Sequence, residues 1–323
     1  MAALKVVVVC GGYFLAVQVA FSQVALPAVR TDGTPLAQND AAIEQARLFH
    51  QPIAVSSPAI TPDGMALGDS SSTDESFGDQ VILKSSPRPR LFTLSGDATV
   101  FYTNNAALTR RATAADEFLV VHAGGSWTPH LAANLDAQIG AAVSIFRYHA
   151  TSSLDFTNLG AGAGLSWSPA TLRGLAVFAR YDFVELLNRH SRQILQDHEF
   201  TIGAQKVFAL GRAHAITLGG LAMAGLSNPH VAQRDQLGVF VGYQLQLTRN
   251  FDSEISYRPA LHFYNSSGRV DLNQIVSWNL RYRITPWSEA DAFVSFGTNR
   301  SDRGVFDYDV FSAGLGLGVS GKF

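Results

Sequence analysis

The sequence is poor in charge and contains no long apolar run beyond its first residues. Charged residues make up 15% of its 323 positions, well below the roughly 25% of a typical soluble domain. After the first residues, no apolar run reaches the roughly 18 positions that a membrane-spanning helix needs. The formal net charge is −2, which offers no basic surface for nucleic acid. We therefore expect neither a helical membrane protein nor a nucleic-acid partner.

Cysteine is almost absent, since Cys10 is the single one in the chain. It lies in residues 1–22, where an apolar stretch is followed by Ala20, Phe21 and Ser22, a small-x-small cleavage site. We expect this segment to be a secretory signal peptide and Cys10 to be discarded with it, rather than to serve as a lipid attachment site. The mature chain would then begin at Gln23 without thiols, so no disulfide or cysteine–metal site would be available.

Residues 23–89 are rich in Ala, Ser, Thr, Pro and Asp. A segment of this composition buries too little apolar surface to offset the entropy of ordering it, so we expect a periplasmic, mostly disordered segment. One stretch differs, because Asn39 and Asp40 could cap a short helix. Its apolar face would carry Ala42, Ile43, Ala46 and Phe49. The segment is either a plug inserted in a pore or a linker that forms this helix transiently.

From Arg90 to the end, apolar and polar residues alternate with a period of two, which is typical of strands with one apolar face. The stretch at 308–323 is the clearest case. Its apolar face carries Phe311, Ala313, Leu315, Leu317, Val319, Gly321 and Phe323. We count about twelve such segments, at 92–103, 117–127, 132–148, 159–167, 175–185, 199–210, 215–226, 237–247, 251–263, 273–284, 289–298 and 308–323.

The connections between these segments alternate in length. Short breaks fall at Pro129, Pro169, Gly211, Arg249 and Pro286, and longer polar stretches fall between them. These longer stretches are 104–116, 149–155, 186–198, 227–235, 265–271 and 299–307. A soluble β-sandwich, the alternative fold, gives no reason for this alternation. Short turns at one end and long loops at the other are typical of membrane β-barrels.

The closing segment ends on Phe323 and carries Gly318 a few residues upstream. It resembles the C-terminal signal of Gram-negative outer-membrane β-barrel proteins, with Gly318 and Phe323 as the membrane-insertion signal. The resemblance implies an all-β fold: a transmembrane antiparallel up-and-down β-barrel of about twelve strands over residues 90–323. It also implies contact with outer-membrane lipids, insertion by the barrel assembly machinery, long loops outside the cell and both termini in the periplasm.

Magnitudes decide which face of the strands meets lipid. In 251–263, one face carries Asp252, Glu254 and Arg258. An arginine facing lipid costs roughly 2–4 kcal/mol at the bilayer midplane, and acidic side chains cost less. Several such costs would consume most of a typical stability. The polar faces should therefore line the interior, with the apolar faces on the lipid.

Charges on this interior face are concentrated late in the chain. Pairing of 251–263 with 273–284 predicts that Asp252 lies near Arg283 and Glu254 near Arg281. Pairing about Pro286 and Trp287 brings Arg283 close to Asp291 as well. These five charged residues form a candidate ladder in the lumen, on the periplasmic side: Asp252, Glu254, Arg281, Arg283 and Asp291. The ladder is either a constriction that selects permeants by charge or an ion network that bridges strands in a closed lumen.

The favoured function is that of a porin-like barrel for the passive diffusion of small solutes. A closed structural or surface-binding barrel is the first alternative, and a lipid-acting outer-membrane enzyme is the second. His190, Asp197 and His198 lie in the stretch 186–198, but no catalytic motif such as GxSxG or HExxH occurs. Such histidines are usually just exposed loop residues. We therefore predict no enzymatic activity, no catalytic or metal-binding residues and no cofactor.

Overall fold

The computed structural model describes residues 2–10, 13–21, 42–43, 91–111, 113–211 and 213–323. Apart from Ala42 and Ile43, the segment 23–89 lies outside these ranges. Strands β1 (Ala2–Cys10) and β2 (Tyr13–Phe21) pair antiparallel with each other in a separate two-stranded sheet. They belong to the segment expected to be a signal peptide, whose removal stays a prediction. In the described ranges, no helix has the length and apolar character to cross a membrane.

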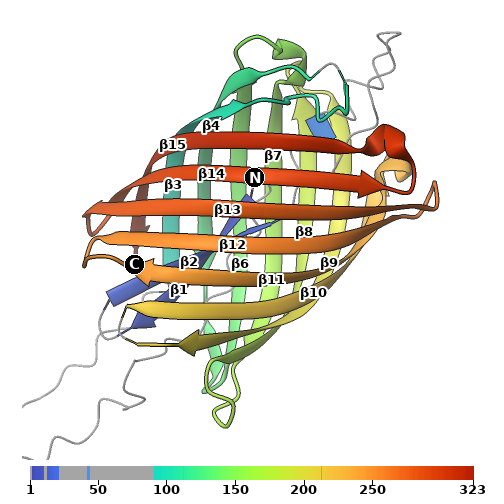
Figure 1. Cartoon of the computed structure of the whole chain (residues 1–323). Helices are drawn as coiled ribbons and strands as arrows, with labels where there is room; N and C mark the ends of the chain where they lie inside the picture. The colour runs from blue at the N-terminus through green and yellow to red at the C-terminus, as the bar shows by residue number, and fades with distance from the viewer. Residues whose placement is uncertain (1, 11–12, 22–41, 44–90, 112, 212) are drawn as a thin grey trace, which may run out of the picture.

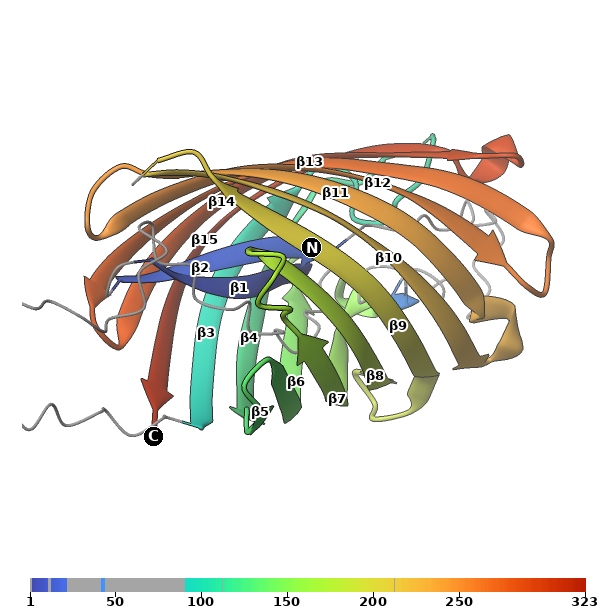
Figure 2. The ribbon, with the colours of Figure 1, turned by 90° about the horizontal axis from the view of Figure 1, so that it is seen from below.

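Twelve antiparallel strands close into one barrel, as predicted (Figures 1 and 2). Each strand pairs with the next, and the last pairs with the first. The strands are β3 (Phe92–Thr103), β4 (Asp116–Trp127), β6 (Leu135–Tyr148), β7 (Phe156–Trp167), β8 (Leu175–Asn188), β9 (Gln193–Ala209), β10 (His214–Asn228), β11 (Arg234–Gln246), β12 (Phe251–Tyr264), β13 (Arg269–Thr285), β14 (Ser288–Ser301) and β15 (Tyr308–Lys322). A short strand, β5 (His130–Ala132), adds to the edge of β6.

The two ends of the barrel differ in their connections. We call the end that carries the connections 104–115, 149–155 and 302–307 the long-loop end, and the opposite end the short-turn end. Three 3-10 turns lie at the long-loop end: η1 (Ser152–Leu154), η2 (His230–Ala232) and η3 (Gly304–Phe306). The alternation in length is less strict than predicted. Strands β8 and β9 extend toward each other, so the stretch 186–198 contains only a short connection, 189–192.

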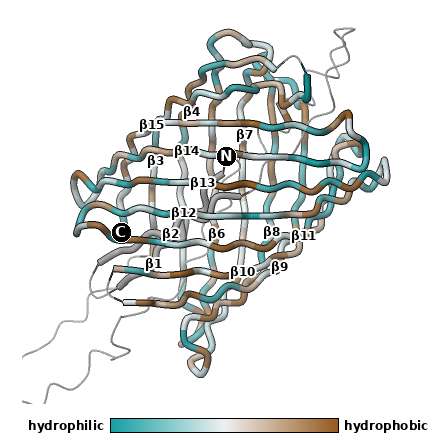
Figure 3. Tube along the Cα trace, in the orientation of Figure 1, coloured by the Kyte–Doolittle hydropathy of each residue, from teal (hydrophilic) through white to brown (hydrophobic). Residues whose placement is uncertain are grey.

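The period of two is realised as an inward and an outward face, which Figure 3 shows as alternating colours along the strands. On β12, Asp252, Glu254 and Arg258 are buried inside the ring, whereas Ile255 and Tyr257 are exposed on its outside. This confirms the predicted orientation of the strand. Because the outward side chains are mostly apolar, they form a surface suited to acyl chains.

Strand β4 corrects the expectation that the whole interior is polar. The run Phe118 to Val121 is apolar on both faces, so its orientation could not be read from the sequence. Phe118 and Val120 are buried inward, and Leu119 and Val121 are exposed outward. The inner surface of β4 near the long-loop end is therefore itself apolar.

Pro259 interrupts the pairing of β11 with β12. Paired residues run from Arg234–Tyr264 to Gly238–Ala260 and resume at Val241–Tyr257 in the same register. Proline has no N–H to donate to a ladder and is rarely found within a fully paired strand. The ring is therefore not uniformly bonded along this seam.

Candidate functional site

The charged residues predicted to form a ladder lie on β12, β13 and β14, close to the short-turn end. The strand register places Asp252 opposite Arg281, and Arg281 opposite Asp291. Arg283 lies opposite Glu289. We call one set of five residues on these three neighbouring strands the inner ion network. Its members are Asp252, Arg281, Arg283, Glu289 and Asp291.

The network is centred on Arg281. Its Nε lies 3.2 Å from Asp291 Oδ1, to which it donates a hydrogen bond, and 3.5 Å from Glu289 Oε2. Arg283 Nη2 lies 3.9 Å from Asp252 Oδ2. The Arg281 side chain is 6% exposed, whereas those of Glu289 and Asp291 are 24% and 29% exposed. A buried cation is thus covered by two carboxylates that remain in contact with solvent.

The geometry agrees with the predicted ladder only in part. Asp252 does lie beside Arg283, and Glu254 lies opposite Asn279 but still interacts electrostatically with Arg281. Asp291, however, pairs with Arg281 instead of Arg283. The turn lies at Pro286 and Trp287, as assumed, with Thr285 opposite Ser288, but a register shift between Arg283 and Thr285, typical of a β-bulge, changes the pairing beyond it. Thr285 Oγ1 accepts hydrogen bonds from the N–H groups of Trp287 and Ser288, at 3.2 and 3.0 Å.

Sequence reasoning missed Glu289 as a member of this network. The signal for it was present, since Glu289 lies two positions before Asp291 and therefore on the same face of the strand.

Two further ion pairs inside the ring were not predicted. Arg269 Nε lies 3.1 Å from Asp271 Oδ1, and its guanidinium stacks over the Tyr264 and Phe306 rings at 3.5 and 3.8 Å. On β8, Arg180 and Asp182 form a buried pair. Their alternation with apolar neighbours indicated an inward direction, but it could not indicate a partner only two residues away on the same strand.

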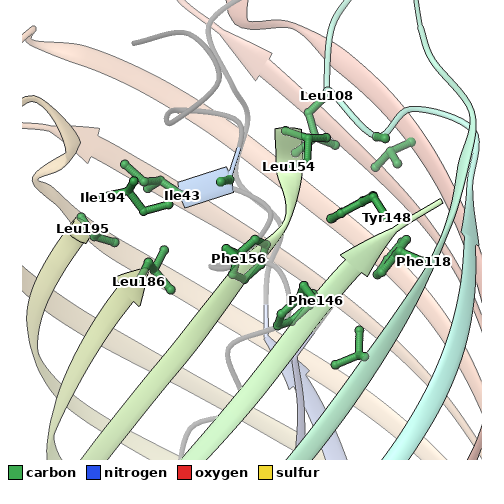
Figure 4. Close-up of a cluster of buried hydrophobic side chains, with 14 of the residues drawn as sticks. Ile43, Leu108, Phe118, Phe146, Tyr148, Leu154, Phe156, Leu186, Ile194 and Leu195 are labelled. Carbon is green, nitrogen blue, oxygen red and sulfur yellow. The ribbon is translucent and has the colours of Figure 1, made fainter. Parts of the chain in front are cut away.

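An apolar cluster occupies the interior at the long-loop end (Figure 4). We call it the outer cluster. Its members are Ala42, Ile43, Ala106, Leu108, Phe118, Val120, Phe146, Tyr148, Leu154, Phe156, Val184, Leu186, Ile194, Leu195, Ala232, Ile275, Tyr308 and Val310. Stacked aromatic pairs organise it, with ring centroids 4.2 Å apart for Phe146–Phe156 and 4.7 Å apart for Phe118–Tyr148. Sequence reasoning did not predict this cluster.

The loop 104–115 turns inward to join the outer cluster. Asn105 holds it, because its Nδ2 donates to the backbone oxygens of Thr109 at 2.8 Å and Asp309 at 3.0 Å. Its Oδ1 accepts from the N–H of Thr109 at 3.0 Å. These bonds tie the loop to β15 and bury Leu108 completely.

The connection between β6 and β7 is fastened by one carboxylate. Asp116 accepts hydrogen bonds from the N–H groups of Ala150 and Thr151, at 2.9 and 2.7 Å. This fixes η1, which places Leu154 in the outer cluster. Two loops are therefore anchored over the interior instead of extending away from it.

The residues considered for an enzyme do not converge. Asp197 and His198 are consecutive in β9, so their side chains point to opposite faces. Asp197 is buried and accepts from Ser227 Oγ at 2.8 Å, whereas His198 Nδ1 lies 2.7 Å from the Tyr181 hydroxyl. His190 lies in the connection between β8 and β9. In the part of the chain that is described, no group of three or more His, Cys, Asp or Glu residues is arranged to hold a metal ion.

Comparison with known proteins gives structural likeness only. No family model and no curated protein sequence matches the chain. An outer membrane channel from Pseudomonas putida F1 is similar, with a TM-score of 0.50 and 12% identity, over 75% of this chain and 100% of that one. An anion-selective porin from Comamonas acidovorans has a TM-score of 0.40 and 8% identity, over 71% and 98% of the two chains.

What this likeness shows is the fold alone. Identities this low indicate a common fold and carry no substrate with them. The ring closure, the two faces and the structural likeness together lead to one conclusion. The chain has the fold of a Gram-negative outer-membrane β-barrel, built from twelve strands.

Proposed function

We propose that the protein is a porin-like barrel in the bacterial outer membrane, through which small solutes diffuse passively. The observation that carries the proposal is the inner ion network, a set of charged side chains inside a closed ring. Three of its members, Arg283, Glu289 and Asp291, keep about a quarter of their side-chain surface accessible. Charged side chains that line a lumen and remain hydrated are the usual means of selecting permeants.

In this proposal the network acts as a polar constriction at the periplasmic end of the barrel. Arg283 is the more accessible of its two cations, so it is the one that a passing ion would meet. Neutralising it would leave an excess of carboxylates in the lumen. The alternative is that the pairs only bridge strands, in which case Arg283 would not influence permeation.

The test is conductance of the mature chain, residues 23–323, in planar lipid bilayers under a KCl gradient. We expect discrete channel events, and we expect Arg283→Ala to shift the reversal potential toward cation selectivity. Arg300→Ala is the matched control, because Arg300 pairs with Asp309 and both side chains are about half exposed. Absence of channel events would overturn the porin-like function. A reversal potential unchanged by Arg283→Ala would remove the constriction.

A closed structural or surface-binding barrel is favoured by one specific observation. Phe146, Phe156 and Leu186 face inward at the long-loop end, yet they have no solvent-exposed surface. A lumen filled in this way would leave the loops as the working surface. Rare openings of the unmodified mature chain, in bilayers where a reference porin conducts, would support this function instead.

A lipid-acting enzyme is the candidate that the geometry supports least, because Asp197, His198 and His190 do not converge. Lipid turnover by the purified protein in detergent micelles, lost on His190→Ala or His198→Ala, would nevertheless establish it. We expect no such turnover.

A further inference from the structure

The inner wall of β8 and β9 is covered at the long-loop end. Leu186, Ile194 and Leu195 belong to the outer cluster, and Leu186 and Leu195 have no exposed surface. A wall residue of an open barrel would face the water in the lumen. These side chains must therefore be packed against other parts of the chain.

Different segments cover different parts of this interior. Leu108 from the inward loop and Leu154 from η1 lie near Tyr148 and Phe156 on the β6–β7 side (Figure 4). Ile43 lies beside Ile194 and near Leu195, on the β8–β9 side (Figure 4). Of the residues labelled there, Ile43 and not Leu108 or Leu154 lies next to Ile194.

The segment that supplies this cover comes from outside the barrel sequence. Ala42 and Ile43 are 3% and 2% exposed, and both belong to the outer cluster. They are the first apolar residues of the short helix predicted after Asn39 and Asp40. The rest of that helix, including Ala46 and Phe49, lies outside the described residues.

The length of the chain allows this position. Ile43 lies at the long-loop end, whereas β3 begins with Phe92 at the short-turn end. Residues 44–90 could span at most roughly 160 Å when fully extended. A strand of the length of β3 spans only about 40 Å. The segment can therefore reach the far end of the interior from the periplasmic side, where β3 begins.

We propose that the N-terminal segment containing Ala42 and Ile43 is an internal plug, which docks on the apolar wall formed by Leu186, Ile194 and Leu195. It covers the wall of β8 and β9 at the long-loop end. The occupant is this chain itself, because its residues already lie on the wall. The inference goes beyond passive diffusion, since it attributes closure of the barrel to the contact between this segment and the wall, which a substitution or deletion can remove.

The first test measures docking without reference to permeation. The mature chain contains no cysteine, so Ile43→Cys combined with Leu195→Cys creates a single pair of thiols for a short bismaleimide cross-linker. We expect most molecules to carry the 43–195 cross-link, detected by mass spectrometry of peptides. The control pair, Ile43→Cys with Val319→Cys, should remain essentially unlinked, because Val319 is exposed on the outside of β15. Equal yields for the two pairs would overturn the docking.

The second test measures closure. Ile43→Asp introduces a charge into an apolar contact, so we expect open-channel events to rise by about tenfold or more, as the loss of one buried aliphatic contact allows. Ile43→Leu keeps the contact and should behave like the unmodified chain. Leu195→Asp changes the wall instead of the plug and should also increase opening. Deletion of 23–89 should give the largest increase, and an unchanged opening frequency in that variant would overturn the plug.

The two tests separate the plug from the porin-like function. A specific 43–195 cross-link with no conductance in any variant, the deletion included, would leave the docking intact and remove passive diffusion. Normal conductance with no specific cross-link would do the reverse. An apolar solute or a second copy of the chain could occupy the wall instead of the N-terminal segment. The yield of the 43–195 cross-link would then fall as solute is added or as protein concentration rises, and either result would contradict the plug.

Discussion

Arg281 is a buried cation that holds carboxylates from a neighbouring strand in place. Asp291 and Glu289 approach the same Nε, and both carboxylates keep partial contact with solvent. Removing one partner of a fully buried ion pair costs roughly 3–5 kcal/mol, because the other charge is left uncompensated. Partial hydration of both carboxylates reduces this cost.

Arg281→Met should therefore lower the free energy of unfolding by about 2 kcal/mol. The measurement is urea unfolding of the barrel in lipid vesicles, followed by tryptophan fluorescence. Arg300→Met is the control, and it should cost less than about 1 kcal/mol because the Arg300–Asp309 pair is exposed. A loss no larger than that of the control would show that the inner ion network does not hold the strands together.

At the residue scale, the direction of a side chain was predictable and its partner was not. The alternation of apolar and polar residues along β12 was sufficient to place Asp252, Glu254 and Arg258 inside the ring. The partner of Asp291 depends on the register shift between Arg283 and Thr285, beyond which Arg281 and not Arg283 lies opposite Asp291. The alternating pattern of the strands does not encode such a register shift.

Strands β10 and β11 show how glycine makes room for aromatic side chains inside the ring. Gly219 faces inward and lies opposite Phe240, and a Cβ atom placed there would clash with the Phe240 ring. The next residue, Gly220, faces outward, and a Cβ there would have only ordinary contacts, the nearest at 3.4 Å from Gly238 O. Two adjacent glycines thus have different roles.

We expect Gly219→Ala to destabilise the barrel by about 1–3 kcal/mol, since Phe240 would have to leave its position. Gly220→Ala should be neutral or slightly stabilising, because it restricts the unfolded chain without a clash. The urea midpoints of the two variants in vesicles provide the comparison. Equal midpoints would show that the interior at Phe240 adapts freely and that the close approach has no energetic weight.

At the element scale, the sequence predicted twelve strands and their order, because most of them carry a clear alternating pattern. The ends of the strands were harder to predict. Strand β9 begins at Gln193, six residues before the predicted start at 199. Its first residues, Ile194 and Leu195, are both buried in the outer cluster, so the alternation that marks a strand is absent there. The same apolar filling obscured the orientation of β4.

For the whole molecule, the stability of the ring depends on one long-range contact. Strand β15 pairs with β3 across more than two hundred residues of sequence. The last bonds of this seam join Phe92 and Phe323, whose backbone N–H groups donate to each other's oxygens at 3.1 and 2.9 Å. The aromatic side chain of Phe323 is exposed on the apolar outside.

Phe323→Ala should reduce the yield of assembled barrel in bacterial membranes severalfold, because it removes the predicted insertion signal without removing the backbone bonds. Phe311→Ala is the control, since Phe311 is also exposed and apolar and lies on the same strand. Heat-modifiable mobility in SDS gels distinguishes folded from unfolded barrel. Equal yields for the two variants would mean that Phe323 contributes no more to assembly than any lipid-facing aromatic residue.

The boundary between β11 and β12 has a consequence for local opening of this closed ring. Opposite Pro259 the cross-strand pairing lapses over two residues before it resumes. The irregularities at β8–β9 and β13–β14 lie near strand ends instead, so the middle of those boundaries should exchange its amides slowly. Among amides in the middle of β11, deuterium should therefore enter first at whichever of Val239 and Phe240 directs its N–H toward β12. Lateral separation of two strands would break the fewest backbone hydrogen bonds at that stretch.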